Sequence, residues 1–271
     1  MGLSAEQQAW QDISGSPLEI LSRSSEAVNP WSQWINAVCQ LSIGDYRKAL
    51  TVLKALVPVE PVEGDVEKSK LSEIEGLASA AIASGLRQLG EHGQALHYDS
   101  LACAGTGSAQ VDGRIGLAAD FVGLGQSVRA ATALAEARQA LDGWRDRVRY
   151  HWVNAEIALL TDETRTAISY AEAATEDAVD SPRHLAKSLL FLGVAKNTYE
   201  KLLGDEQLIE SVGISDSLQL RPLLWPAVRV LEDRADPAQI AKANEALSFI
   251  ADRIPSGLGS HWEGLDVVRR G

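Results

Sequence analysis

One tight-turn pattern recurs along the middle of this chain and constrains its fold more than any other feature. Each occurrence follows an apolar stretch and precedes another that carries an alanine five residues after the turn begins. The turns begin at positions 44, 90, 125 and 162, which are 46, 35 and 37 residues apart. Apolar residues between them recur at intervals of three and four, which is the period of an amphipathic helix, and no convincing strand pattern is present. The pattern predicts an all-α chain of stacked helix–turn–helix units.

Small residues accompany every turn at the same two places. The helix before the turn carries an alanine seven residues upstream of it, at Ala37, Ala83, Ala118 and Ala155. The helix after the turn carries an alanine five residues downstream, at Ala49, Ala95, Ala130 and Ala167. Small residues at these positions allow the two helices of a unit to approach closely. The first of these segments, residues 31–56, therefore predicts a complete helical hairpin.

The turn Gly44-Asp45-Tyr46-Arg47-Lys48-Ala49-Leu50, together with these small residues, resembles the tetratricopeptide repeat. The resemblance covers residues 30–178, although the aromatic positions of that family are mostly absent. It implies a right-handed α-solenoid of antiparallel helix pairs. Residues 183–190 are also similar to uncharacterised actinobacterial repeat proteins, a likeness that implies no activity.

The whole chain, residues 1–271, is predicted to form one helical-repeat domain. Pro17, Pro30, Pro182 and Pro237 each follow a residue with a short polar side chain, which is the pattern of a capped helix start. Residues 58–70 are an insertion that we interpret as an exposed linker or an extension of the next helix. The expected parts are lead helices at 1–29, four repeats at 30–178, a divergent repeat with capping helices at 179–254, and a loosely docked tail at 255–271.

Charge and composition limit the partners. The formal charge is −12, which disfavours nucleic acid as a partner and favours solubility. Cys39 and Cys103 lie far apart in apolar helical patterns, which predicts buried thiols in a reducing compartment. The first residues lack the pattern of a signal peptide, and no apolar run is long enough to span a bilayer. We therefore expect a cytoplasmic protein without membrane insertion; the sequence does not define its oligomeric state.

The sequence contains no convincing catalytic or metal-binding motif. Its five histidines form no H-x-x-x-H or H-E-x-x-H pair, and the two cysteines are not at ligand spacing. The glycines near positions 105–108 and 123–125 follow no strand and lack the Lys-Ser/Thr of a phosphate loop, so they predict helix ends. We expect no catalytic residue, no metal site, no cofactor and no enzymatic activity.

The most unusual stretch, residues 145–152, holds three arginines, a histidine and two aromatic residues in an acidic protein. The next repeat begins with further basic residues. In stacked hairpins the first helices line the concave face, so both clusters are predicted to line one groove. The alternative is that these arginines only form ion pairs with nearby carboxylates. The predicted groove comprises Arg145, Arg149, Trp152, Glu156, Arg183, His184, Lys187 and Asn197; by the same register, Trp34 and Arg87 face inward.

Three functional hypotheses follow. The first is a non-catalytic scaffold that binds a protein or peptide segment, of acidic character, in the concave groove. The second is a ligand-sensing regulatory domain that acts through a partner protein. The third and weakest is an enzyme with a site assembled between repeats, which a deep polar pocket of clustered titratable groups would favour.

Overall fold

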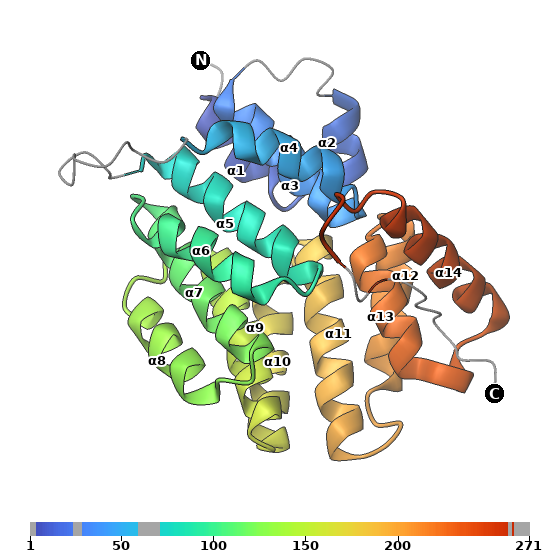
Figure 1. The fold of residues 1–271 in the computed structure, drawn as a ribbon. Helices are drawn as coiled ribbons and strands as arrows, with labels where there is room; N and C mark the ends of the chain where they lie inside the picture. Colours follow the sequence, from blue (N-terminus) through green and yellow to red (C-terminus); the bar gives the residue numbers. More distant parts are fainter. Residues whose placement is uncertain (1–3, 24–28, 59–70, 260–261, 263–271) are drawn as a thin grey trace.

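The computed structural model describes residues 4–23, 29–58, 71–259 and 262, and this part of the chain is all-helical (Figure 1). The predicted insertion therefore lies almost entirely outside the described residues, as do parts of the predicted lead segment and tail. The helices are α1 (Ala5–Asp12), α2 (Pro17–Arg23), α3 (Pro30–Ile43), α4 (Tyr46–Leu56), α5 (Glu73–Gln88), α6 (His92–Cys103), α7 (Ser108–Gly123), α8 (Ser127–Arg138), α9 (Gly143–Leu160), α10 (Thr164–Asp177), α11 (Pro182–Tyr199), α12 (Asp205–Ser217), α13 (Arg221–Leu231) and α14 (Pro237–Ala251), with a 3-10 turn at Glu232–Arg234.

The four predicted turns each contain a residue in the left-handed region. Gly44, Gly90 and Gly125 have φ angles of 88°, 77° and 72°, and Asp162 takes the equivalent place at 60°. Glycine adopts this region without steric cost, and aspartate is among the few other residues that tolerate it. These turns join α3 to α4, α5 to α6, α7 to α8 and α9 to α10. All eight alanines beside the turns are fully buried, as their positions predicted.

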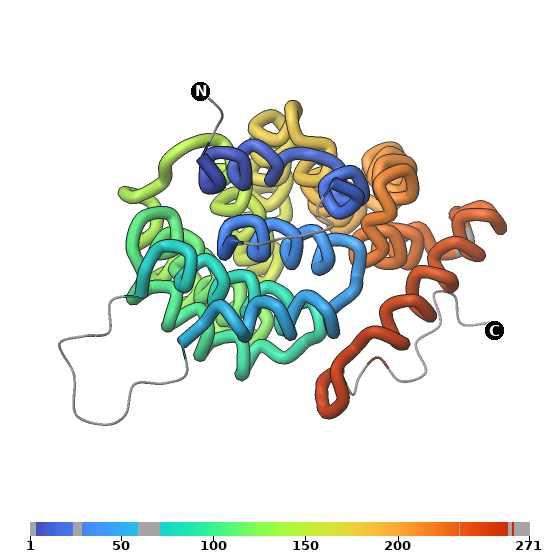
Figure 2. Tube along the Cα trace, turned by 90° about the horizontal axis from the view of Figure 1, so that it is seen from above, coloured from blue at the N-terminus to red at the C-terminus, as the bar shows by residue number. Residues whose placement is uncertain are grey.

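The odd-numbered helices from α3 to α13 form an inner layer that returns to its start. Each of these helices contacts the next odd-numbered one, and α13 also contacts α3. Seen from above, α3 crosses the middle of the molecule, with α5–α8 on one side and α11–α14 on the other (Figure 2). Hydrogen bonds connect the two ends of the chain of helices: Arg221 donates to the carbonyl of Ile43 at 3.3 Å, and the backbone N–H of Arg47 donates to the carbonyl of Arg253 at 2.8 Å. The inner helices therefore enclose a centre rather than leaving an open concave face.

Of the helix starts predicted before prolines, two are capped as expected and one is not. Asn29 and Asp236 accept backbone N–H groups at the starts of α3 and α14, and Ser4 caps α1 together with Gln7. Ser181 was expected to cap α11, but its Oγ contacts His184 Nδ1 at 2.7 Å instead. The same hydroxyl also donates to the carbonyl of Ser14 at 3.4 Å, so these two contacts take the place of the expected cap.

Cys39 is buried and Cys103 is half-buried, and both are free thiols. The described part of the predicted tail is better docked than expected, since Trp262 is 8% exposed and packs edge-on against Trp225 at 5.3 Å. In the parts of the chain that the structure covers, no helix is both long and apolar enough to cross a membrane.

The close approach of the paired helices can be tested on α8. Ala130 is fully buried where α8 packs on its neighbours, whereas Ala135 on the same helix is exposed. Ala130→Leu should lower the free energy of unfolding by about 1–3 kcal/mol through overpacking. The control Ala135→Leu should change it by less than about 0.5 kcal/mol. Urea denaturation measures both, and equal effects would contradict the packing described here.

Candidate functional site

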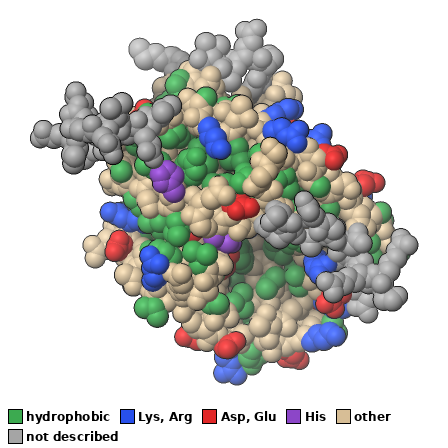
Figure 3. Space-filling view, in the orientation of Figure 1, with side chains coloured by type: hydrophobic (Ala, Val, Ile, Leu, Met, Phe, Trp, Pro, Cys, Tyr) green, Lys and Arg blue, Asp and Glu red, His purple; other side chains and the backbone are tan. Residues whose placement is uncertain are grey.

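A cavity of about 520 Å³ lies at the centre of the inner layer. All six inner helices, α3, α5, α7, α9, α11 and α13, contribute to its lining, and residues such as Ile13 and His92 complete it. The space-filling view shows this face of the molecule hollowed near its middle, with hydrophobic side chains inside the hollow (Figure 3). A cavity of this size matches the pockets that hold small molecules.

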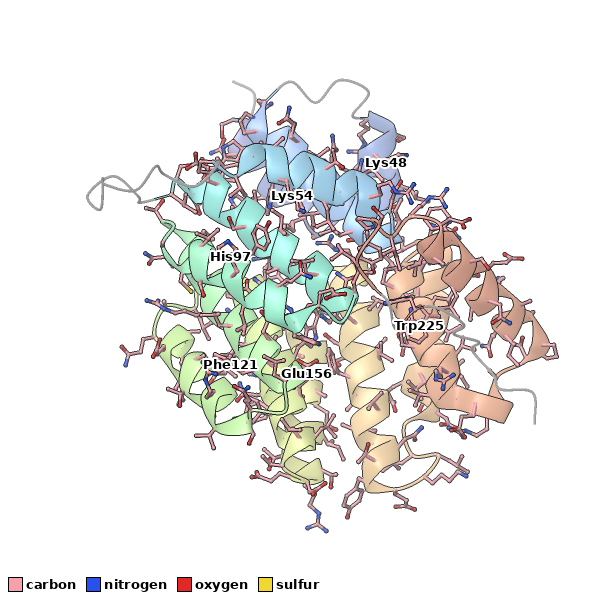
Figure 4. The ribbon with its side chains drawn as sticks, viewed as in Figure 1. Lys48, Lys54, His97, Phe121, Glu156 and Trp225 are labelled. Carbon is pink, nitrogen blue, oxygen red and sulfur yellow. The ribbon has the colours of Figure 1, made fainter. Side chains whose placement is uncertain are left out.

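Helix α9 provides one side of the cavity through a single stripe. Arg145, Arg149, Trp152 and Glu156 follow one another at intervals of four, three and four residues, so they share one face of the helix. All four line the cavity. Glu156 lies at mid-height, between α7 and α11 (Figure 4).

Helix α11 provides the adjacent side. Arg183, His184 and Lys187 line the cavity, so the structure brings together seven of the eight residues that the sequence predicted for the groove. Asn197 is the exception. It lies further along α11, donates to Asp205 Oδ1 at 2.8 Å and accepts the N–H of Gly204 at 2.7 Å, and so holds the start of α12.

One buried carboxylate holds two of the arginines. Asp112 on α7 is 3% exposed and accepts two hydrogen bonds of 2.8 Å from the guanidinium of Arg145. Arg149 donates to the same carboxylate. Arg147, on the opposite face of α9, pairs instead with Asp177 on the outer helix α10. The alternative that these arginines form ion pairs with nearby carboxylates is therefore correct in part. Inside the cavity, however, one carboxylate lies between two guanidinium groups.

A second buried cluster lies around Arg87 on α5. Its guanidinium donates to Asp99 at 2.6 Å and to Asp120 at 2.8 Å, and both carboxyl groups are fully buried. Burial raises the pKa of Asp99 to about 8, although Arg87 opposes the rise and the neighbouring Asp120 adds to it. At neutral pH, Asp99 therefore neutralises less of the positive charge of Arg87 than its formal charge suggests.

Two cations in the cavity, Arg183 and Lys187, form no direct salt bridge with a carboxylate among the described residues. Arg183 donates to Ser42 Oγ at 2.8 Å and to the carbonyl of Ile13 at 2.7 Å, and both acceptors are uncharged. Lys187 lies over the rings of Trp152 and Phe191, with Nζ 4.3 and 5.6 Å from the ring centres. A cation in a partly buried site with neutral acceptors alone is incompletely compensated.

Burial shifts the pKa of the residues around Lys187. The pKa of Lys187 falls to about 8, chiefly through burial and then through nearby arginines, while Glu156 opposes the fall. Burial also raises the pKa of Glu156, an effect that Lys187 partly offsets. The pKa of His184 lies well below its usual value because the ring is buried beside several cations, so the ring is neutral at pH 7. It stacks on Trp152 with ring centres 5.8 Å apart.

The charges at the cavity favour an anion. Five cationic side chains line it, against the carboxylates of Asp112 and Glu156 in the lining, with Asp99 and Asp120 behind Arg87 and Asp146 beside Arg145. The cavity is thus more cationic than the rest of a chain with a formal charge of −12. No group of three or more His, Cys, Asp or Glu side chains within the described residues is placed to hold a metal ion.

Sequence reasoning missed the acidic partners of these arginines. Asp112 stands in one inward stripe of α7 with Ile115, Gly116 and Ala119, so the helical period could have assigned it to the cavity. Asp99 belongs to the outer helix α6 and reaches Arg87 only because Gly116 has no side chain at that place: a Cβ there would lie 2.2 Å from Asp99 Oδ1. Nothing in the local sequence signals that contact.

Comparison with known proteins finds no family, curated protein or solved structure that matches this chain.

The structural importance of Asp112 is open to direct test. Asp112→Asn should lower the free energy of unfolding by roughly 3 kcal/mol, because it removes the ion-pair partner of the partly buried Arg149 and leaves Arg145 with Asp146 alone, 3.7 Å away. Asp177→Asn, which removes the partner of the half-exposed Arg147, should cost about 1 kcal/mol or less. Chemical denaturation of both variants measures the difference, and a similar cost for the two would show that Asp112 does not neutralise buried charge.

Proposed function

We propose that this protein is a non-catalytic binding protein whose central cavity takes a small molecule that carries an anionic group. The observation that supports it most is the pair Arg183 and Lys187, two cations that line the cavity and form no direct salt bridge among the described residues, although Glu156 lies close enough to Lys187 to oppose the fall in its pKa. Guanidinium and ammonium groups bind carboxylate and phosphate oxygens strongly, and more so out of bulk water. An anion supplied by a ligand would complete the charge balance of the site.

The shape of the site favours a small molecule over a long peptide. An extended peptide needs an open groove, whereas here α3 and α13 meet and the inner helices surround the cavity. Of the three hypotheses from the sequence, this arrangement favours the ligand-sensing domain. We propose that this domain acts on a protein partner in the cytoplasm.

We also propose that the helix pairs form a right-handed solenoid of tetratricopeptide-like repeats, which α14 caps. The buried alanines and left-handed turns support the repeat assignment.

Catalysis is a second candidate function. Glu156 and Lys187 line the same cavity, and the pKa of the carboxyl group is raised while that of the amine is lowered. Groups with pKa values shifted toward neutrality are typical of acid–base catalysts. Recovery of the bound ligand after incubation separates the two functions: an unchanged ligand supports binding alone, and a converted ligand supports catalysis.

Anion binding can be tested with inorganic phosphate and butanoate as probes. Both should bind the wild-type protein, as measured by isothermal titration calorimetry. Lys187→Gln should weaken the binding about tenfold or more, because it removes a charged hydrogen-bond donor. Lys54→Gln removes an exposed lysine on α4, far from the cavity lining, and should leave the affinity unchanged. If neither probe binds, or if the two variants lose affinity equally, the proposed function is wrong.

The affinity for an anion should also depend on pH. Lys187, whose pKa is about 8, is charged below that pH and loses its proton above it. Binding should therefore be strongest below pH 7 and should weaken as the pH rises through about 8, by up to about tenfold per pH unit. Asp99 ionises over the same range and acts in the same direction.

Lys187→Arg separates the two contributions, since arginine keeps its charge throughout this range. The variant should lose most of the pH dependence and retain the part that Asp99 causes. An unchanged pH profile in this variant would exclude Lys187 as the titrating ligand group.

A further inference from the structure

A shallow groove continues from the charged cavity. Val122, Glu156 and Phe191 line both the cavity and the groove, so the two spaces are contiguous. Apart from Glu156, the side chains that line the groove are all apolar. They come chiefly from α9, α11 and α13 and include Leu159, Leu160, Leu190, Val194, Pro226 and Val230.

The change from charged to apolar follows the direction of the inner helices. Along α11 the lining passes from Lys187 to Val194, and along α9 it passes from Arg149 to Leu160. Both helices therefore present cations in their N-terminal halves and apolar side chains near their C-terminal ends. One elongated space results, with a cationic end inside the molecule and an apolar end towards its surface, where Leu160 is 41% exposed.

Charge complementarity and polarity together define the occupant. A plain inorganic anion would satisfy the cations but leave the groove uncovered, and a purely apolar segment would cover the groove but leave the cations unpaired. We infer that the ligand is an amphiphile, with a carboxylate or phosphate headgroup beside Lys187 and Arg149 and an unbranched chain of about eight to twelve carbons in the groove. The inference rests on the proposed function and names the class of its ligand.

The dimensions of the space agree with such a chain. Lys187 and Val194 are seven residues apart on α11, which corresponds to roughly 10 Å along a helix. An extended chain of about eight carbons covers that distance, and a few more carbons reach the rim of the groove. Glu156, at the junction, lies in surroundings that raise the pKa of its carboxyl group, and a chain that covers it will reduce its tendency to ionise further.

Calorimetric titration with a series of alkyl carboxylates tests the inference on the full chain, at concentrations below micelle formation. Affinity should rise by about two- to fourfold for each methylene that enters the groove, and so by roughly 60-fold or more from butanoate to decanoate. It should level off beyond about twelve carbons, where the chain leaves the groove. Decyl phosphate and decanoate compare the two headgroups, and tighter binding of either supports the inference and identifies the headgroup.

Matched variants locate the chain. Leu160→Asp, at an exposed position on the rim of the groove, should weaken decanoate binding about tenfold or more. Val194→Thr keeps the shape of the side chain and should weaken it about threefold. Val128→Asp, at an 80% exposed position on α8 outside both spaces, should have no effect. Butanoate is too short to reach the groove and reports whether the charged cavity of each variant is intact.

Three results would overturn the inference. Equal affinity for butanoate and decanoate would support the anion site but show that the alkyl chain of the ligand does not bind in the groove. Equal affinity for decanoate and uncharged 1-decanol would assign the groove to an apolar partner without a headgroup. An affinity that continues to rise well beyond twelve carbons would indicate unspecific adsorption. If no anion in the series binds, including phosphate, the proposed function fails as well.

Discussion

The contact between α3 and α13 determines what the interior of this protein can be. Without it, the inner faces of the helix pairs would form an open groove, and their polar side chains would be exposed to bulk water. With it, the side chains on α9 and α11 lie in a cavity where charges are poorly solvated and interact strongly. Arg183 contributes to this closure from within, since its guanidinium reaches Ser42 and the carbonyl of Ile13 across the cavity.

Because the inner helices surround the cavity, burying cationic side chains there lowers the stability of the fold. Removing a charged group from water costs several kcal/mol unless partners compensate it. Asp112 provides that compensation for Arg149 and, together with Asp146, for Arg145, and two buried carboxyl groups provide it for Arg87. Apolar residues at 183 and 187 would fill the same space without this cost. Local departures of this kind from the most stable arrangement are typical of functional sites, where a ligand completes the balance.

Features that depend on neighbouring residues could be predicted from the sequence. The left-handed turns at Gly44, Gly90 and Gly125 and the buried alanines follow from local sterics and helical period. The same period placed Arg145, Arg149, Trp152 and Glu156 on one face of α9. It failed for Asn197, because the period alone does not show where α11 leaves the cavity and begins to contact α12.

Features that depend on distant residues could not be predicted. The hydrogen bond from Arg183 to Ile13 joins residues 170 positions apart, and nothing near either residue indicates it. An open groove and a closed cavity can therefore share the same repeat pattern, and the sequence alone favoured the open one. The proposed class of ligand changes with this difference, from a protein segment to a small molecule.

The most direct measurement is a crystal structure of the protein with bound selenate, a tetrahedral anion that anomalous scattering locates without ambiguity. The account predicts an anomalous peak inside the cavity, within about 3.5–4.5 Å of Lys187 Nζ and of at least one of the arginines, as expected for a selenium atom whose oxygens accept hydrogen bonds of ordinary length. Peaks confined to the outer surface at saturating selenate, with Lys187 in a direct ion pair with Glu156, would contradict it.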